Sequence, residues 1–333
     1  MFPFNPGRIL FSFFLLLSTI FVITGCKREN SFVANDPTQI AVIDLSGTDR
    51  RIIERLDSTL NEVQLPGTTE PFFSSVEFGP FNSEKMPETP NLFLLVSTAT
   101  VKSDTALGRL FSKDVLSKAD ISDEAVFIKR ESLFYDGQIV WFLVYNSNEG
   151  LQRFIVNRIS SASATMMSTN INRIISRDGT GSRYDRELSA AITREWGIEL
   201  KLPDGFEEVD SLRSGNALYR RGAGTKTEEW MLISEIKGVD SIAIDSVRDV
   251  VTGKLIRYQD GSQMKTVSSF NYLGRSGYYR GKWETSPYPM AGLFTARILK
   301  KGSRALYIEA GIYSPGRNKT LNLLRLEKLL RDL

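Results

Sequence analysis

Two kinds of hydrophobic spacing alternate along this chain and predict its helices and strands. Apolar residues three or four apart predict helices over residues 49–63, 105–111, 148–177 and 185–196. Continuous or alternating apolar runs predict strands over residues 39–44, 91–97, 125–131 and 138–145. Asp49 stands where an N-cap is expected, and Asp136-Gly137 between the last two strands is a strong hairpin signal. Gly197 is a natural C-cap for the last of these helices.

Two stretches of this first half depart from regular spacing. Residues 65–90 are rich in Pro, Gly, Ser and Phe, which predicts a long irregular connection. Within residues 148–177 the apolar face changes between Met166 and Ile171. We therefore expect the long helix to bend or break between these two residues.

After Gly197 the pattern changes to short strands. They are predicted over residues 198–202, 217–221, 229–235, 277–284, 292–299 and 305–313. A turn at Lys301-Gly302 joins the last two, and helices are predicted over residues 244–255 and 323–333. Because strands and helices mix without strict alternation, we predict an α+β fold with mixed or antiparallel sheets and packed helices. We expect a single compact body with two subdomains, an N-terminal α/β subdomain over residues 39–197 and a C-terminal α+β subdomain over residues 198–333.

The N-terminus has the features of a lipoprotein signal peptide, predicted over residues 1–25. Arg8 precedes an apolar run of about 15 residues, which spans roughly 22 Å as a helix and is shorter than the roughly 30 Å core of a bilayer. Small residues then stand directly before Cys26, the only cysteine. The alternative is an uncleaved membrane anchor. Residues 26–38 are polar and lack periodicity, so we predict a tether there.

Lipid attached to Cys26 would hold the protein on a membrane, because several acyl chains together give stable attachment. Lys27 follows the cysteine, in place of the Asp that typically retains lipoproteins at the inner membrane. We therefore expect a lipid anchor in the outer membrane. The sequence leaves both faces of that membrane open, because Lys27-Arg28-Glu29 is a poor match to acidic surface-export signals.

Charge and residue usage remove several classes of function. The chain has 42 Lys and Arg against 39 Asp and Glu, and this formal net charge of +3 gives no case for nucleic-acid binding. It contains no histidine, which excludes Ser-His-Asp catalysis, Cys-His catalysis and histidine metal sites. With Cys26 acylated, neither a free thiol nor a disulfide is left. We predict no metal and no cofactor.

Three clusters of residues stand out from the surrounding sequence. They are Leu65-Pro66 with Glu70-Pro71-Phe72-Phe73, Arg248-Asp249 with Gly261-Ser262-Gln263-Met264, and Arg280-Gly281-Lys282-Trp283-Glu284 with Met290-Ala291-Gly292-Leu293-Phe294. Together with Tyr313-Ser314-Pro315 they resemble an uncharacterised lipoprotein family common in Bacteroidetes, a domain of unknown function. The sequence departs from that family's pattern at Pro90 and Leu293. The resemblance implies an envelope location and one folded unit, without an assigned activity.

The third cluster alternates between two faces if it forms a strand. Trp283 would then be a core anchor with Gly281 allowing close packing, while Arg280 and Glu284 would share the opposite face. We take Arg280, Trp283 and Arg248 as candidate binding residues. The alternative for Arg280 and Glu284 is an ordinary surface ion pair, which contributes about 0–1 kcal/mol.

Paired carboxylates offer a hydrolytic chemistry that needs neither histidine nor cysteine. A glycan hydrolase of this kind would use Glu284 with Glu70 or Asp249, and its carboxyl groups would stand about 5–9.5 Å apart across a cleft. The simpler interpretation of Glu70 is an extended loop residue, because the position before Pro71 disfavours helix.

A short Asp-Ser/Thr pattern resembles the O-glycosylation acceptor of envelope proteins in the same bacterial group. Its candidate acceptors are Thr105, Ser211, Ser241 and Ser246. Asp-Ser and Asp-Thr also cap helices and form turns, and so short a motif arises by chance. Glycosylation at these residues is therefore a hypothesis with a structural alternative.

Together these observations favour a non-enzymatic, lipid-anchored envelope protein that serves binding or envelope assembly. Its partner would be an envelope protein or a glycan, in addition to the membrane that holds the lipid. The alternative is a carboxylate-dependent enzyme that acts on glycans or peptidoglycan. A third interpretation is a structural subunit of a larger envelope complex, which predicts an exposed apolar patch larger than a monomer tolerates.

Overall fold

The computed structural model describes residues 36–80, 87–176, 183–209, 215–236, 244–256, 261–271, 277–302 and 304–333. The predicted signal peptide, Cys26 and the tether up to residue 35 lie outside these ranges, as do Ser211 and Ser241. None of the helices within the described ranges is long and apolar enough to span a bilayer.

The first sheet contains five strands in the order β2-β1-β3-β5-β4. They are β1 (Gln39–Asp44), β2 (Ser75–Pro80), β3 (Asn91–Ser97), β4 (Val126–Glu131) and β5 (Ile139–Tyr145). Neighbouring strands are parallel except β4, which pairs antiparallel with β5 across the predicted hairpin. The central strands are almost entirely buried, as is usual for parallel strands with helices on both faces.

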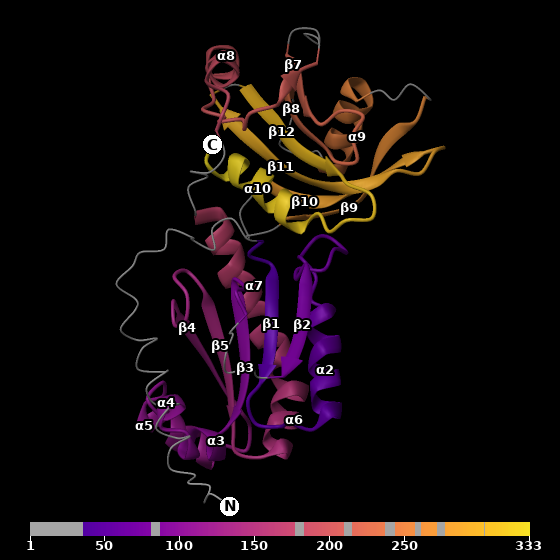
Figure 1. Cartoon of the computed structure of the whole chain (residues 1–333). Helices are drawn as coiled ribbons and strands as arrows, with labels where there is room; N and C mark the ends of the chain where they lie inside the picture. The colour runs from indigo at the N-terminus through magenta and orange to yellow at the C-terminus, as the bar shows by residue number, and fades with distance from the viewer. Residues whose placement is uncertain are drawn as a thin grey trace, which may run out of the picture.

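Helices cover both faces of this first sheet (Figure 1). One face packs against α2 (Arg50–Asn61), α6 (Asn148–Asn157) and α7 (Ile159–Ser176), and the other against α3 (Thr98–Ser103), α4 (Thr105–Gly108) and α5 (Lys113–Ile121). The start of α2 is the predicted one, because the Asp49 carboxylate accepts a hydrogen bond from the backbone N–H of Arg51. One stripe of α2 is buried in the core and orients the helix on the sheet.

The second sheet contains seven antiparallel strands in the order β6-β7-β8-β12-β11-β10-β9. They are β6 (Glu207–Glu208), β7 (Asn216–Arg221), β8 (Glu228–Ile236), β9 (Gln263–Asn271), β10 (Tyr278–Ser286), β11 (Ala291–Lys301) and β12 (Arg304–Tyr313). One face is covered by α9 (Ile244–Leu255), and the other by α8 (Arg186–Trp196) and α10 (Thr320–Arg331) (Figure 1). The predicted α+β class, with mixed and antiparallel sheets and packed helices, is confirmed.

The two sheets share a continuous hydrophobic core and so form one body. The segment between α2 and β2 reinforces their junction. The backbone carbonyl of Pro71 accepts hydrogen bonds of 2.9 Å from Asn318 Nδ2 and Thr320 Oγ1, at the start of α10. Glu70 Oε1 accepts one of 3.0 Å from Lys319 Nζ. The first of the three sequence clusters is therefore a bridge between the sheets.

Glycines paired with aromatic residues on neighbouring strands shape the face of the second sheet beneath α9. The three pairs are Gly281–Phe294, Gly292–Trp283 and Gly311–Trp230. A Cβ added to Gly311 would lie 2.1 Å from the Trp230 ring, so only glycine lets the indole approach the backbone this closely. The recurring Gly and aromatic positions of the third cluster are thus explained by packing.

Several local predictions are wrong. The segment 198–202 is buried at Ile198, Leu200 and Leu202 but is no strand, because alternating burial against a core does not require a hydrogen-bonded neighbour. The connection predicted to be irregular over residues 65–90 contains the strand β2. The sequence does not predict β9, because this strand lies at the sheet edge and most of its side chains are exposed. The long helix breaks at Arg158, between α6 and α7, and not between Met166 and Ile171.

Candidate functional site

The candidate site lies at the carboxyl ends of the parallel strands of the first sheet. β1, β3 and β5 run side by side and end at one edge. The chain leaves β1 into α2 on one face of the sheet and leaves β3 into α3 on the other. Such a divergence of neighbouring strands is a topological switch point, the place where open α/β sheets bind their ligands.

Asp44, the last residue of β1, organises the loop at this edge. Its carboxylate accepts hydrogen bonds from the backbone N–H of Ser46 at 3.0 Å and from the Thr48 hydroxyl at 2.8 Å. The Thr48 hydroxyl also lies 2.9 Å from the phenol oxygen of Tyr145, at the end of β5. The loop after β1 is therefore connected to the end of β5.

Further hydroxyl groups link the same loop to β3. Ser46 Oγ lies 2.8 Å from Thr100 Oγ1 and accepts a hydrogen bond of 2.8 Å from the backbone N–H of Ser97. Ser97 in turn caps α3, because its side chain accepts from the backbone N–H of Thr100. Ser46, Thr48, Ser97 and Thr100 are all half-buried, so neighbours hold them in place and solvent still reaches them.

The phenol of Tyr145 is neutral at this edge. Burial is the main cause of its raised pKa; the Thr48 hydrogen bond opposes that effect, and the negative charge of Asp44 adds to it. The edge therefore presents several hydroxyl groups, which both donate and accept hydrogen bonds, beside one carboxylate. This set suits a polar ligand with hydroxyl groups of its own, whereas Asp44 would repel a phosphate.

None of the candidate residues predicted from the sequence lies at this edge. A signal was present, since Asp44 and Ser97 end two predicted buried strands and hydroxyl residues follow each of them. Its meaning depends on the strand order, because only the adjacency of β1 and β3 brings the two groups together.

Arg248, a candidate binding residue, is fully buried. Its Nη2 donates to Glu309 Oε1 at 3.0 Å, and neither side chain is exposed (0% each). Glu309 also accepts hydrogen bonds from Trp230 Nε1 at 3.3 Å and from the Tyr307 hydroxyl at 2.5 Å. The guanidinium lies 4.1 Å from the centre of the Phe294 ring. Arg248 therefore joins α9 to β12 inside the core and does not present its charge to solvent.

Arg280 forms a corresponding pair on the other face of the second sheet. Its Nε lies 3.1 Å from Glu327 Oε2 on α10, and its Nη1 donates to the backbone carbonyl of Pro66 at 2.8 Å. The carboxylate partner is thus Glu327, not the expected Glu284. Because Pro66 precedes β2, Arg280 also connects the second sheet to the segment that bridges the two sheets.

Trp283 lies wholly within the core. Its side chain is 0% exposed, and its indole N–H donates to the backbone carbonyl of Leu293 at 3.3 Å. The ring packs against Gly292 on the neighbouring strand and against Trp230, whose ring centre is 5.3 Å away. The three candidate binding residues are therefore packing residues in this structure.

The three candidate catalytic carboxylates have separate surroundings. Asp249 on α9 accepts a hydrogen bond of 2.7 Å from the hydroxyl of Thr266, which is opposite Trp283 in the sheet. Glu284 follows Trp283, so it projects from the opposite face of the sheet and is exposed. A catalytic pair of Glu284 and Asp249 is contradicted, because the sheet lies between them. Glu70 forms an ion pair of 3.0 Å with Lys319.

Two of the candidate glycosylation sites lie within the described ranges. Thr105 is the first residue of α4 and Ser246 lies in the first turn of α9, and both are exposed. Asp104 caps α4 by accepting hydrogen bonds from the backbone N–H groups of Ala106 and Leu107, so its motif has a structural role there. Among the described residues, no group of three or more acidic or cysteine side chains is placed to hold a metal ion.

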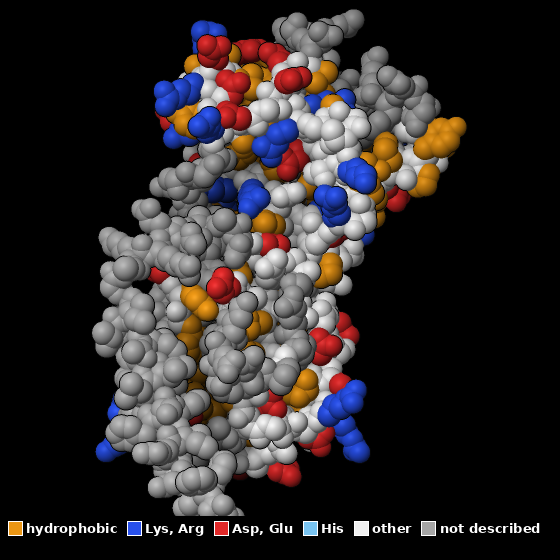
Figure 2. Space-filling model, viewed as in Figure 1, with side chains coloured by type: hydrophobic (Ala, Val, Ile, Leu, Met, Phe, Trp, Pro, Cys, Tyr) orange, Lys and Arg blue, Asp and Glu red, His pale blue; other side chains and the backbone are white. Residues whose placement is uncertain are grey.

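Large apolar side chains that reach the surface are scattered over the described part of the chain. They are Ile121, Phe134, Val156, Tyr184, Val250, Val267, Phe270 and Tyr288. Only Val267 and Phe270, both on β9, share an element. Acidic and basic side chains are interspersed over the body of the second sheet on the face shown in Figure 2. Scattered apolar residues of this kind are ordinary on protein surfaces.

Residues 185–332 match the profile of a family described as a domain of unknown function, DUF4837. The matched stretch comprises α8, the whole second sheet, α9 and nearly all that follows. A search of curated proteins finds no match. The second half of the chain is therefore similar to a family whose function is not assigned.

Solved structures give distant similarities. The Ran-binding protein Mog1p of Saccharomyces cerevisiae is 11% identical over 40% of this chain and 87% of its own length, with a TM-score of 0.28. A STAR-related lipid transfer protein from Xanthomonas axonopodis is 11% identical over 38% of this chain and 99% of its own, with a TM-score of 0.20. At such TM-scores neither similarity bears on function.

Proposed function

We propose that this protein is lipid-anchored in the outer membrane and binds a glycan of the cell envelope without catalysing a reaction on it. The observation that carries the proposal is the hydroxyl cluster at the switch point between β1 and β3. Ser46, Thr48 and Thr100 supply its hydroxyl groups, and Asp44 supplies its carboxylate. Its position favours ligand binding, because open α/β sheets take their ligands at the carboxyl ends of diverging strands.

A glycan matches the chemistry of this edge. Sugar hydroxyls donate and accept hydrogen bonds, as the serine and threonine hydroxyls do, and a carboxylate such as Asp44 accepts from sugar hydroxyls. The neutral phenol of Tyr145 adds another donor and acceptor. The charge of Asp44 disfavours anionic ligands, so we expect a neutral stretch of glycan.

Binding without catalysis is favoured by the residues that the chain has to offer. It contains no histidine, and its single cysteine is the residue we expect to carry lipid. The sheet separates Glu284 from Asp249, and Glu70 is paired with Lys319.

Calorimetry or NMR titration with soluble, neutral fragments of envelope glycans tests the binding site. Thr48→Val and Thr100→Val each remove one hydroxyl with little change of shape, and we expect each to weaken binding about tenfold, the loss of a hydrogen bond to a polar ligand. Thr165→Val, an exposed threonine on α7, is the matched control and should bind as the unaltered protein does. Equal affinities for all three variants would exclude the switch point as the site.

The anchor needs its own test, because Cys26 lies outside the described residues. In cells supplied with labelled fatty acid, we expect the full-length protein to incorporate label and Cys26→Ser to incorporate none. The serine variant should also keep its leader. A variant processed and labelled like the unaltered protein would reject the lipid anchor and leave the glycan site to be judged separately.

A further inference from the structure

A pocket lies against the second sheet, beside the end of α8. Its volume is about 360 Å³, and it is bounded by the residues after α8, the end of β11 and the residues after α10. Its aliphatic lining comes from Ile198, Leu299, Leu306 and Leu333, and the other residues that line it are Gly197 and four charged residues. Ile198 and Leu306 are 7% and 1% exposed, so the deepest part of the lining is firmly packed. An aliphatic lining with a few polar groups is typical of small-molecule sites.

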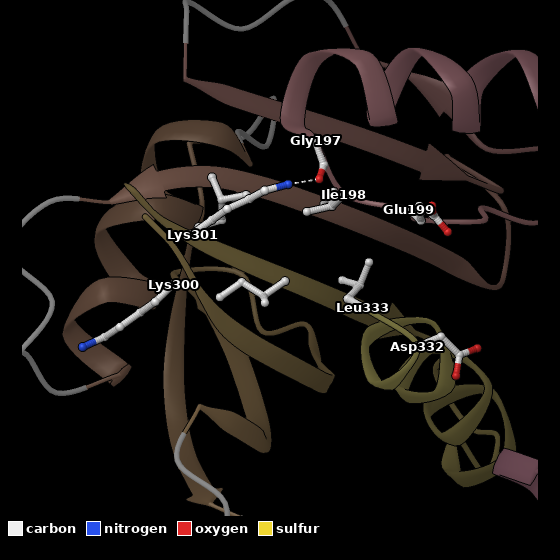
Figure 3. A pocket seen from close by; sticks show the side chains of 9 residues that line it. Gly197, Ile198, Glu199, Lys300, Lys301, Asp332 and Leu333 are labelled. Carbon is white, nitrogen blue, oxygen red and sulfur yellow. Dashed lines mark hydrogen bonds between the residues drawn. The ribbon is translucent and has the colours of Figure 1, made fainter. Parts of the chain in front are cut away.

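Charged groups of opposite sign stand at the two ends of this pocket (Figure 3). Lys301 extends along one end, and its ammonium donates a hydrogen bond to the backbone carbonyl of Gly197. Glu199 and Asp332 lie toward the opposite end. Lys300, the neighbour of Lys301, also borders the pocket, but its ammonium points away from it (Figure 3).

The position of the Lys301 ammonium is defined by the end of α8. Gly197 is the C-cap of that helix with a positive φ of 68°, and its carbonyl accepts from Lys301. A Cβ on residue 197 would lie 2.8 Å from Lys301 Nζ, so the approach of the ammonium requires glycine. An ammonium has three N–H donors, and the bond to Gly197 uses one of them.

We infer that this pocket binds a short peptide with an aliphatic side chain and two free termini. The carboxylate terminus would pair with Lys301, the ammonium terminus with Glu199, and the aliphatic side chain would lie against Ile198 and Leu333. A ligand with only one charged group could pair with Lys301 or with Glu199, but not with both ends of the pocket.

This site is separate from the carboxyl edge of the first sheet, because every residue that lines it belongs to the second sheet or to the segments beside it (Figure 1). All the residues that line it come from α8 onward. Either site can therefore fail its test without affecting the other.

Titration of the full-length protein with the dipeptide Ala-Leu tests the inference. We expect saturable binding, weakened about tenfold by Lys301→Met, which keeps the apolar stem and removes the charged donor. Lys300→Met is the matched control and should bind within about twofold of the unaltered protein, because its ammonium points away. Glu199→Gln should weaken binding to a similar extent as Lys301→Met. Equal affinities for the two lysine variants would overturn the assignment, and so would a lack of saturation at about 10 mM peptide.

Variants of the ligand separate charge recognition from simple apolar binding. N-acetyl-Ala-Leu lacks the ammonium and Ala-Leu amide lacks the carboxylate, and we expect each to bind about tenfold more weakly than Ala-Leu. Lys301→Met should discriminate less against the amide, since the group that the carboxylate meets is gone. If both blocked peptides bind as well as Ala-Leu, the pocket recognises only the side chain and the inference fails. Phosphoethanolamine is the free form of a lipid headgroup. If it binds more tightly than Ala-Leu, the peptide is rejected as the ligand in favour of a lipid headgroup.

Discussion

Arg280 on β10 and Glu327 on α10 form an ion pair inside the protein, with 3% and 0% of their side chains exposed. Arg248 on α9 and Glu309 on β12 form a second buried pair on the opposite face of the same sheet. Charges can be buried at acceptable cost when they are paired and hydrogen-bonded. Each pair therefore joins one helix to the second sheet through a buried contact.

Removing one partner of the Arg280–Glu327 pair should destabilise the fold strongly. Glu327→Gln keeps the shape of the side chain but leaves the Arg280 charge buried without its counter-ion. We expect the free energy of unfolding to fall by about 3–5 kcal/mol, measured by urea titration.

The matched control for this substitution is Glu235→Gln. Glu235 pairs with Arg304 at 3.1 Å, but 31% and 49% of their side chains are exposed. Its replacement should change the free energy of unfolding by about 0–1 kcal/mol. If Glu327→Gln lowers the free energy of unfolding no more than Glu235→Gln does, the buried pair contributes little to stability.

Glycine should be indispensable beneath the indole of Trp230 and replaceable on α9. Gly311→Ala places a methyl group 2.1 Å from the Trp230 ring, so we expect a loss of about 1–3 kcal/mol or a failure to fold. Gly253 lies in the helix α9 with no atom within 4 Å of the position that a Cβ would take. Gly253→Ala should therefore stabilise the protein by about 0.5–1 kcal/mol. Thermal melting distinguishes the two, and melting temperatures that shift in the same direction would contradict this account.

Buried tyrosines should make the fold sensitive to alkali. Burial, with the negative charges of Glu208 and Glu195, raises the pKa of Tyr219 to about 12. In the unfolded chain the phenol ionises near pH 10. Between these two values the unfolded state has lost a proton that the folded state keeps, so the free energy of unfolding falls as pH rises from about 10 to 12.

Phenylalanine at position 219 should reduce that dependence on pH. We expect Tyr219→Phe to show a smaller decline in unfolding free energy across this window, and Tyr288→Phe, at a position 59% exposed, to decline like the unaltered protein. Parallel curves for all three proteins would mean that Tyr219 ionises alike in both states.

A cation from β11 should stabilise the end of α10. Arg297 Nη1 donates to the backbone carbonyl of Leu330 at 2.8 Å, in the last turn of the helix. Arg297→Met keeps much of the apolar stem and removes this bond, so we expect a loss of about 1–2 kcal/mol in unfolding free energy. Arg325→Met, at an exposed position of the same helix, should have little effect. Equal losses for the two variants would show that the bond from Arg297 to Leu330 does not account for the stability of this helix end.

The sequence predicts those features of the fold that depend on neighbouring residues. Asp49 caps α2 through a backbone N–H two residues on, and Gly197 ends α8 within its own turn, so both follow from local pattern. Arg280 illustrates the opposite case, because its partner is 47 residues away on a helix that the sequence shows only as a leucine stripe. The candidate site was missed for the same reason, since strand order alone brings Ser46 to Thr100.

The position of β12 has a consequence for how the chain acquires its structure. β12 lies between β8 and β11, so it separates β6, β7 and β8 from β9, β10 and β11. Neither group can join the other until residues 304–313 have left the ribosome and paired on both sides. Pairings this distant in sequence form slowly, and until then the growing chain exposes two unprotected strand edges. A nascent chain stalled before β12 is therefore the form of this protein that we expect to need a chaperone most.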